Sequence, residues 1–204
     1  MLKVGLTGSI AVGKSFVCGI LAENGCHVLD ADETAREVVR PGTEGLMRVV
    51  RVFGESVLAE DGTLDRKALG AIVFRSDEKR QRLNSILHPL IIESQNRWLK
   101  AREKGAPGGI AVVEASLMIE SGSYTRFDEL IVVWCEAEIQ LERLIERDSI
   151  SREVALERIA AQMTQEEKMA HATLLIDSSA GFEETRLQTL AVLGKLKERV
   201  SKSN

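Results

Sequence analysis

The run that most constrains the fold is Gly8 to Ser15, which reads GSIAVGKS. It stands between an apolar run, Leu2 to Thr7, typical of a buried strand, and a helical pattern that ends at Gly25. The pattern G-x-x-x-x-G-K-[ST] in this position predicts a loop whose backbone N–H groups surround phosphate oxygens at a helix N-terminus. A chance match in a chain of this length has a probability on the order of 1%, so a phosphate-binding loop is strongly favoured over an incidental glycine turn.

Two side chains of this loop are predicted to bind the phosphates and their metal ion. Lys14 is expected to reach the β- and γ-phosphates of a nucleotide, and the hydroxyl of Ser15 is expected to hold Mg²⁺.

Four further apolar runs predict strands, at 26–30, 110–114, 130–134 and 174–177. They are apolar at successive positions and do not alternate, as expected where helices cover both faces of a parallel sheet. The sequence therefore predicts an α/β fold with a five-stranded parallel sheet.

Two long stretches without strand patterns interrupt this core. Helical patterns lie at 32–39, 43–52, 65–74, 77–87 and 89–104. They predict a helical insertion over 32–106, because the stretch is too long for a simple crossover. A second excursion over 136–169 contains a cap at Ser151 and a capping box at Thr164 and Glu167, which predict two or three short helices. One domain results, with a core of about 1–31, 107–135 and 170–204.

Composition narrows the class of protein. The 204 residues are 44% hydrophobic and 28% charged with a net charge of −4, which excludes a disordered chain and offers nucleic acid no general attraction. The apolar runs are too short to span a membrane and the N-terminus lacks a signal-peptide pattern, so a cytosolic protein is expected. Cys18, Cys26 and Cys135 are far apart, which predicts buried thiols and no zinc site.

Among nucleotide-binding proteins, a small-molecule kinase fits best. The chain has no Asn-Lys-x-Asp segment of the kind that reads guanine in GTPases, and it is too short to carry large mechanical domains.

Asp30 and Asp32 follow the second predicted strand, at the sheet edge where α/β proteins bind ligands. One of these carboxylates is suited to accept a proton from an acceptor hydroxyl. A second interpretation makes Asp32 the N-cap of a helix that begins near Glu33, and the two roles are compatible.

Arg143 and Arg147 are four residues apart in a helical stretch, where they repel each other unless an anion or nearby acids such as Glu142 and Glu146 offset the charge. Together with Arg152, Arg158 and Lys168 they suggest a mobile basic segment that closes over triphosphate. A simple solvated face is the alternative.

The chain resembles the dephospho-coenzyme A kinase family over nearly its whole length. The resemblance rests on an ordered set of motifs: the phosphate loop, LDAD at 29–32, GTLDR at 62–66, ILHPLI at 86–91, LMIE at 117–120, QLxRLxxRD at 140–148 and AQ at 161–162.

The resemblance implies ATP-dependent phosphorylation of the ribose 3′-hydroxyl of dephospho-coenzyme A in a P-loop nucleoside triphosphate hydrolase fold. The insertion would bind the substrate, the 136–169 segment would be the lid, and a monomer is expected. The implied catalytic residues are Asp32 as base, Lys14, Arg143 and Arg147. The implied nucleotide contacts are Gly8, Ser9, Ile10, Ala11, Val12, Gly13, Lys14, Ser15 and Phe16, and the implied substrate contacts are Asp32, Asp65, Arg66 and His88.

The chain departs from the family pattern at several positions. The family usually reads Gly-Ser-Gly-Lys-Ser-Thr where this chain has Ala11 to Phe16, and Phe16 cannot make the α-phosphate contact of a threonine hydroxyl. Ser116 replaces a usual Pro and Ser178 a common Asn. Glu114 at a strand end either orients Mg²⁺ or its water, or caps a helix. A nucleoside or nucleoside-monophosphate kinase and a nucleotide-responsive switch remain alternatives.

Overall fold

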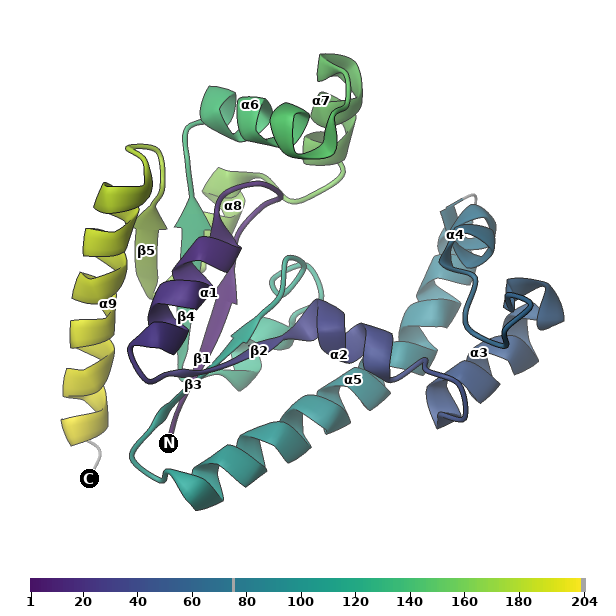
Figure 1. The fold of residues 1–204 in the computed structure, drawn as a ribbon, viewed down its shortest axis with the longest axis horizontal. Coiled ribbons are helices and arrows are strands. Elements are labelled where there is room, and N and C mark those ends of the chain that lie inside the picture. Colours follow the sequence, from purple (N-terminus) through teal and green to yellow (C-terminus); the bar gives the residue numbers. More distant parts are fainter. Residues whose placement is uncertain (75, 203–204) are drawn as a thin grey trace. The chain divides into compact units, whose positions relative to one another are not determined.

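The computed structural model describes residues 1–74 and 76–202. In this part of the chain, five strands form one parallel sheet in the order β2-β3-β1-β4-β5 (Figure 1). The strands are β1 (Leu2–Thr7), β2 (His27–Asp30), β3 (Ile110–Glu114), β4 (Glu129–Trp134) and β5 (Leu174–Asp177). The predicted α/β fold with a five-stranded parallel sheet is confirmed, with strand ends shifted by at most one residue from the prediction.

β1 is the central strand, and its neighbours fix where its two ends lie. Leu6 is paired with Glu114 of β3 and with Ile131 of β4, and Thr7 is paired with Val132. Since the strands are parallel, the carboxyl ends of β1, β3 and β4 meet at one edge of the sheet. The segment after Thr7 therefore emerges between the ends of two neighbouring strands.

One face of the sheet is covered by α1 (Lys14–Glu23) and α9 (Phe182–Lys202). The core on this face joins buried strand residues such as Leu6 and Ile131 to Val17 of α1 and Leu196 of α9. On the other side of β1, a Cβ added to Gly5 would lie 2.6 Å from the Met118 sulfur, so a larger residue here would force Met118 to shift. Burial of both faces explains the uninterrupted apolar strand sequences.

The chain divides into two compact units, residues 1–29 with 101–204 and residues 30–100. The second unit is helical and has its own small core around Val49, Val57, Leu69 and Ile86. Its elements are α2 (Ala31–Glu37), α3 (Glu44–Phe53), the 3₁₀ turn η1 (Glu55–Val57), α4 (Arg66–Phe74) and α5 (Asp77–Gly105), the last five residues of which belong to the first unit.

The prediction of separate helices at 77–87 and 89–104 is wrong, because α5 is one helix with Pro89 inside it. Proline lacks an N–H group for the carbonyl oxygen of Ser85, but both residues are exposed, so water can satisfy that oxygen. Ile86 and Leu99 are buried on either side of the proline, and their packing supports a continuous helix.

The N-cap of α2 also differs from the prediction. Asp30, and not Asp32, caps this helix: its Oδ1 accepts the N–H groups of Asp32 at 2.7 Å and Glu33 at 3.3 Å. The helix begins at Ala31 directly after β2, two residues earlier than expected, which moves the capping position to the last strand residue.

The 136–169 segment forms three helices, α6 (Ala137–Asp148), α7 (Arg152–Ala160) and α8 (Gln165–Met169). Ser151 caps α7, and Thr164 with Glu167 forms the capping box of α8, as predicted. The 3₁₀ turn η2 (Ser123–Arg126) precedes β4.

All three cysteines are free thiols, and Cys26 and Cys135 are buried as predicted, whereas Cys18 is partly exposed. Burial raises the pKa of Cys26 to about 11, so this thiol stays protonated. Within the described residues, no helix is both long and apolar enough to cross a membrane.

The cap at Asp30 yields a stability prediction. Asp30→Ala leaves two backbone N–H groups of α2 without their acceptor, so the free energy of unfolding should fall by about 1 kcal/mol. Asp30→Asn keeps an acceptor oxygen and should stay close to wild type in urea denaturation followed by circular dichroism. Equal losses in the two variants would contradict the capping role.

Candidate active site

The phosphate loop joins β1 to α1 through a backbone with three residues at positive φ. Gly8 has φ +152°, Ala11 +62° and Gly13 +86°. A Cβ on Gly8 would collide with the carbonyl oxygen of Val133, and Gly13 is the N-cap residue of α1. The loop thus places the positive end of a ten-residue helix at the carboxyl edge of the sheet, where it can attract an anion.

Lys14, the first residue of α1, is turned towards its own loop. Its Nζ donates to the carbonyl oxygen of Ser9 at 3.1 Å and lies 3.8 Å from a carboxylate oxygen of Glu114. Both charged side chains are mostly buried, with exposed fractions of 10% and 14%. Glu114, expected either near Mg²⁺ or as a helix cap, therefore faces the lysine that is predicted to bind phosphate.

Arg143 of α6 is connected to the phosphate loop through Ser178, which follows β5. Its guanidinium donates to the Ser178 hydroxyl at 3.0 Å and to the Ser178 carbonyl oxygen at 2.8 Å. The same hydroxyl donates to the carbonyl oxygen of Val12 at 2.8 Å, and Ser178 is almost completely buried. The structure thus brings Arg143 beside the loop, where its charge can meet that of a bound nucleotide.

The other arginines of the 136–169 segment already have acidic partners. Asp148 accepts from Arg147 at 2.8 Å and from Arg158 at 2.6 Å, and the hydrogen bond from Arg147 holds the pKa of Asp148 below its ordinary value. Arg152 is paired with Glu138. Solvent screens such exposed ion pairs, so a phosphate group can displace them at small cost.

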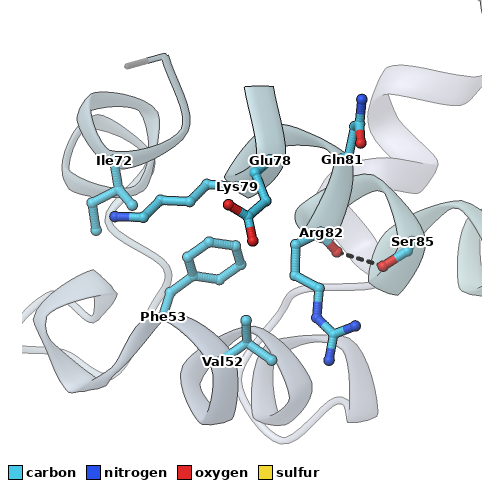
Figure 2. A pocket seen from close by; sticks show the side chains of 8 residues that line it. All are labelled: Val52, Phe53, Ile72, Glu78, Lys79, Gln81, Arg82 and Ser85. Atoms are coloured by element: carbon cyan, nitrogen blue, oxygen red, sulfur yellow. Dashed lines mark hydrogen bonds between the residues drawn. The ribbon is translucent and has the colours of Figure 1, made fainter. Parts of the chain in front are cut away.

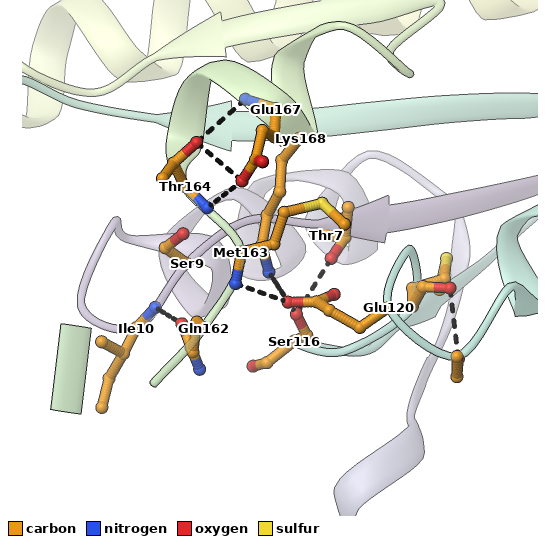
Figure 3. Close-up of polar contacts among 12 residues, drawn as sticks. Thr7, Ser9, Ile10, Ser116, Glu120, Gln162, Met163, Thr164, Glu167 and Lys168 are labelled. Carbon is orange, nitrogen blue, oxygen red and sulfur yellow. Dashed lines mark hydrogen bonds and ion pairs between the residues drawn. The ribbon is translucent and has the colours of Figure 1, made fainter. Parts of the chain in front are cut away.

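Lys168 does not belong to a solvent-facing basic surface, and this expectation was wrong. Its side chain is fully buried, and Nζ lies 2.9 Å from a carboxylate oxygen of Glu120 and donates to the Ser116 carbonyl oxygen at 2.8 Å (Figure 3). The helical pattern of 165–169 contains no sign of a partner so distant in sequence. The lysine instead connects α8 to the loop after β3.

Two glutamines that were not predicted as site residues hold Ile10 of the phosphate loop, and a third glutamine supports one of them. Gln162 accepts the Ile10 N–H at 2.8 Å, and Gln140 donates to the Ile10 carbonyl oxygen at 2.8 Å. Gln165 donates to Gln140 and exchanges two hydrogen bonds with the backbone of Cys135. The only signal in sequence was that two of these glutamines lie within the motifs of the family resemblance.

Phe16, which departs from the family pattern, packs against another aromatic residue. Its ring meets that of Phe182 edge to face, with centroids 4.9 Å apart. Phe182 is 73% exposed at the start of α9. The substitution therefore replaces a hydroxyl by an aromatic contact at the first turn of α1.

The predicted substrate residues lie in the helical unit. Asp32 is exposed in the first turn of α2, Arg66 is the exposed first residue of α4, and His88 is exposed on α5. Asp65 caps α4, since its Oδ1 accepts the N–H groups of the second and third helical residues at 2.9 Å each.

An open cavity of about 610 Å³ lies between α3, α4 and α5 in the same unit (Figure 2). Its described lining residues are Val52, Phe53, Ile72, Glu78, Lys79, Gln81, Arg82 and Ser85. None of the predicted substrate residues is among them, so this cavity does not support their assignment.

A parallel sheet with this loop between its central strand and first helix defines a P-loop nucleotide-binding protein. Comparisons with known proteins show to which family of P-loop proteins the chain belongs. The family model described as dephospho-CoA kinase matches residues 2–184.

Relatives and solved structures agree with this match. A dephospho-CoA kinase from Geobacter metallireducens is 46% identical over all of this chain and 99% of its own length, and one from Listeria monocytogenes is 42% identical over 93% of this chain and 94% of its own. A crystal structure from Thermus thermophilus has a TM-score of 0.81 at 32% identity, and a dephospho-CoA kinase from Campylobacter jejuni has 0.73 at 28%; each comparison covers 96% of this chain and 97% of the other. The chain belongs to the dephospho-CoA kinase family.

Ala11 gives a prediction for the loop itself. A residue with a Cβ in the left-handed region costs about 1–2 kcal/mol, whereas glycine adopts it freely. Ala11→Gly should therefore raise the free energy of unfolding by up to about 1 kcal/mol, once the added freedom of the unfolded chain is subtracted. Ala22→Gly, inside α1, is the matched control and should destabilise in urea denaturation. A loss of stability in Ala11→Gly would contradict the inference that the backbone at Ala11 is strained.

Proposed function

We propose that this chain transfers the γ-phosphoryl group of ATP to the ribose 3′-hydroxyl of dephospho-coenzyme A, giving coenzyme A and ADP. The observation that carries the proposal is the phosphate loop with Lys14 in a chain that belongs to the dephospho-CoA kinase family over residues 2–184. The relatives from Geobacter and Listeria bear the name of this activity.

Mg²⁺ fits the proposed site as a partner of the nucleotide. The described residues contain no cluster of three or more His, Cys, Asp or Glu side chains suited to a metal. Mg²⁺ commonly keeps several waters and binds through few protein groups together with substrate phosphates, which suits a site of this kind. Ser15 is exposed in the first turn of α1 and would supply its hydroxyl, while the ion would neutralise charge on the phosphates.

In the proposed mechanism, Lys14 binds the transferred phosphoryl group. Its ammonium lies between the Ser9 carbonyl oxygen and Glu114, so it is held at the loop before nucleotide arrives. Arg143 stays beside the loop through Ser178 and stabilises charge on the phosphates. Arg147 exchanges Asp148 for phosphate when the 136–169 segment acts as a lid.

Asp32 is the proposed base for the acceptor hydroxyl. It is exposed and follows the end of β2 by two residues, and its own side chain is not the cap of α2 because Asp30 performs that task. An exposed carboxylate soon after a strand end is of the type that suits general base catalysis. Asp65, Arg66 and His88 are the proposed acceptor contacts.

The proposal also covers the location of the protein, its oligomeric state and its partners. We place the protein in the cytoplasm as a monomer, without nucleic acid or membrane partners, in accord with its net charge of −4.

A panel of acceptors with radiolabelled ATP tests this function. Dephospho-coenzyme A should be phosphorylated far faster than adenosine or AMP, and Lys14→Ala should abolish the transfer without changing the far-UV circular dichroism spectrum. Equal use of adenosine would favour a nucleoside kinase, and labelled nucleotide bound without phosphorylation of any acceptor would favour a nucleotide-responsive switch.

Replacement of Asp32 tests whether this residue is the general base. Asp32→Asn keeps the size of the side chain but removes its basicity, so kcat should fall by about 10²–10⁴ while nucleotide affinity and Tm remain near wild type. Asp30→Asn is the matched control, because asparagine preserves the cap of α2. A larger loss of kcat in Asp30→Asn than in Asp32→Asn would show that the base is the other carboxylate.

A further inference from the structure

Among the described residues, Lys168 is a fully buried charged side chain that the proposed mechanism does not use. A buried charge is tolerated only where partners compensate for its lost hydration. Here the compensation comes from the Glu120 carboxylate at 2.9 Å and the Ser116 carbonyl oxygen at 2.8 Å, both in the loop after β3 (Figure 3). Two charge-assisted contacts thus hold that loop.

The same loop is held by two further contacts. The Glu120 carboxylate accepts the backbone N–H of Met163 at 3.3 Å, and the Thr7 hydroxyl lies 3.4 Å from the Ser116 carbonyl oxygen. Thr7 is the last residue of β1, immediately before the phosphate loop. Lys168 therefore acts on a carbonyl group that contacts the base of the phosphate loop.

The segment from Gln162 to Lys168 consequently contacts three parts of the nucleotide-binding unit. Gln162 accepts from Ile10 in the phosphate loop, Gln165 is bonded to the backbone of Cys135 after β4, and Lys168 holds the loop after β3. The capping box of Thr164 and Glu167 fixes the start of α8 between these contacts.

Ser116 lies two residues after Glu114, whose carboxylate faces Lys14 at 3.8 Å. Glu114 is the last residue of β3 and is paired with Leu6, so a shift of the loop that follows acts on the end of the strand that carries the Glu114 carboxylate. Displacements of about 1 Å at a reacting centre can reduce a rate by about 10²-fold, even when the mutated residue is distant from the chemistry.

We infer that Lys168 is a positioning residue for phosphoryl transfer: through Ser116 and Glu120 it fixes the loop after β3, and with it Glu114, against the phosphate loop and Lys14. This inference rests on the proposed function, because the transfer rate is its measure. Lys168 touches neither the acceptor nor the nucleotide in this account.

The test compares Lys168→Met with the double variant Lys168→Met/Glu120→Gln. The single variant leaves a carboxylate without its cation, which should lower Tm by on the order of 10 °C. The double variant removes that charge and should recover most of the Tm. Lys195→Met, at an exposed lysine of α9, is the matched control and should match wild type in kcat and Tm.

Measurements of kcat then distinguish a positioning role of Lys168 from a role in stability alone. At a temperature where all variants are folded, kcat should fall about tenfold or more in both Lys168 variants, while the Kd for ADP stays within about threefold of wild type. Lys168→Arg, which keeps the charge, should recover part of the lost kcat. If the single variant does not fold, the double variant alone decides.

A wild-type kcat in the double variant would overturn the inference, since Lys168 would then serve stability alone. A wild-type kcat in folded Lys168→Met would overturn it as well. Failure of the wild-type chain to phosphorylate dephospho-coenzyme A would instead contradict the proposed function, so the two failures are distinguishable.

Discussion

The nucleotide-binding unit depends on a backbone that an unconstrained chain rarely adopts. The phosphate loop turns through positive φ at Gly8, Ala11 and Gly13, and it lies between the ends of β3 and β4. Backbone in such conformations persists where the surrounding structure supports it, and neighbouring groups hold this loop. Ser178 holds Val12 from the β5 side, and Gln140 and Gln162 hold Ile10 from the α6 to α8 side.

These contacts give the 136–169 segment a second role beside that of a proposed lid. Leu141, Leu144 and Ala155 form a small core that also packs against Ile10 and Ala11. Arg143 reaches the loop from the same helices, whereas Arg147 and Arg158 lie together on Asp148. The apolar and amide contacts fix the loop, whereas the remaining arginines are held by weak surface ion pairs, which is compatible with their proposed binding of phosphate.

Local sequence rules predicted the elements but missed several connections between them. The strand runs, the cap at Ser151 and the capping box at Thr164 follow from nearest neighbours, and each is present. The prediction of a helix break at Pro89 was wrong because packing of Ile86 and Leu99 outweighs one missing hydrogen bond. The partners of Lys168 were not predictable, since an ion pair between α8 and the loop after β3 depends on tertiary structure alone. The roles of Asp32, Asp65, Arg66 and His88 stay predictions, because they concern an acceptor.

In the proposed reaction, the γ-phosphoryl group of ATP goes to the acceptor hydroxyl of dephospho-coenzyme A. Simultaneous measurement of ADP and of phosphorylated acceptor, by ³¹P NMR with ATP, Mg²⁺ and dephospho-coenzyme A, tests this claim most directly. We expect one coenzyme A for every ADP and almost no ADP when the acceptor is left out. ADP formed at the same rate with and without dephospho-coenzyme A would contradict it.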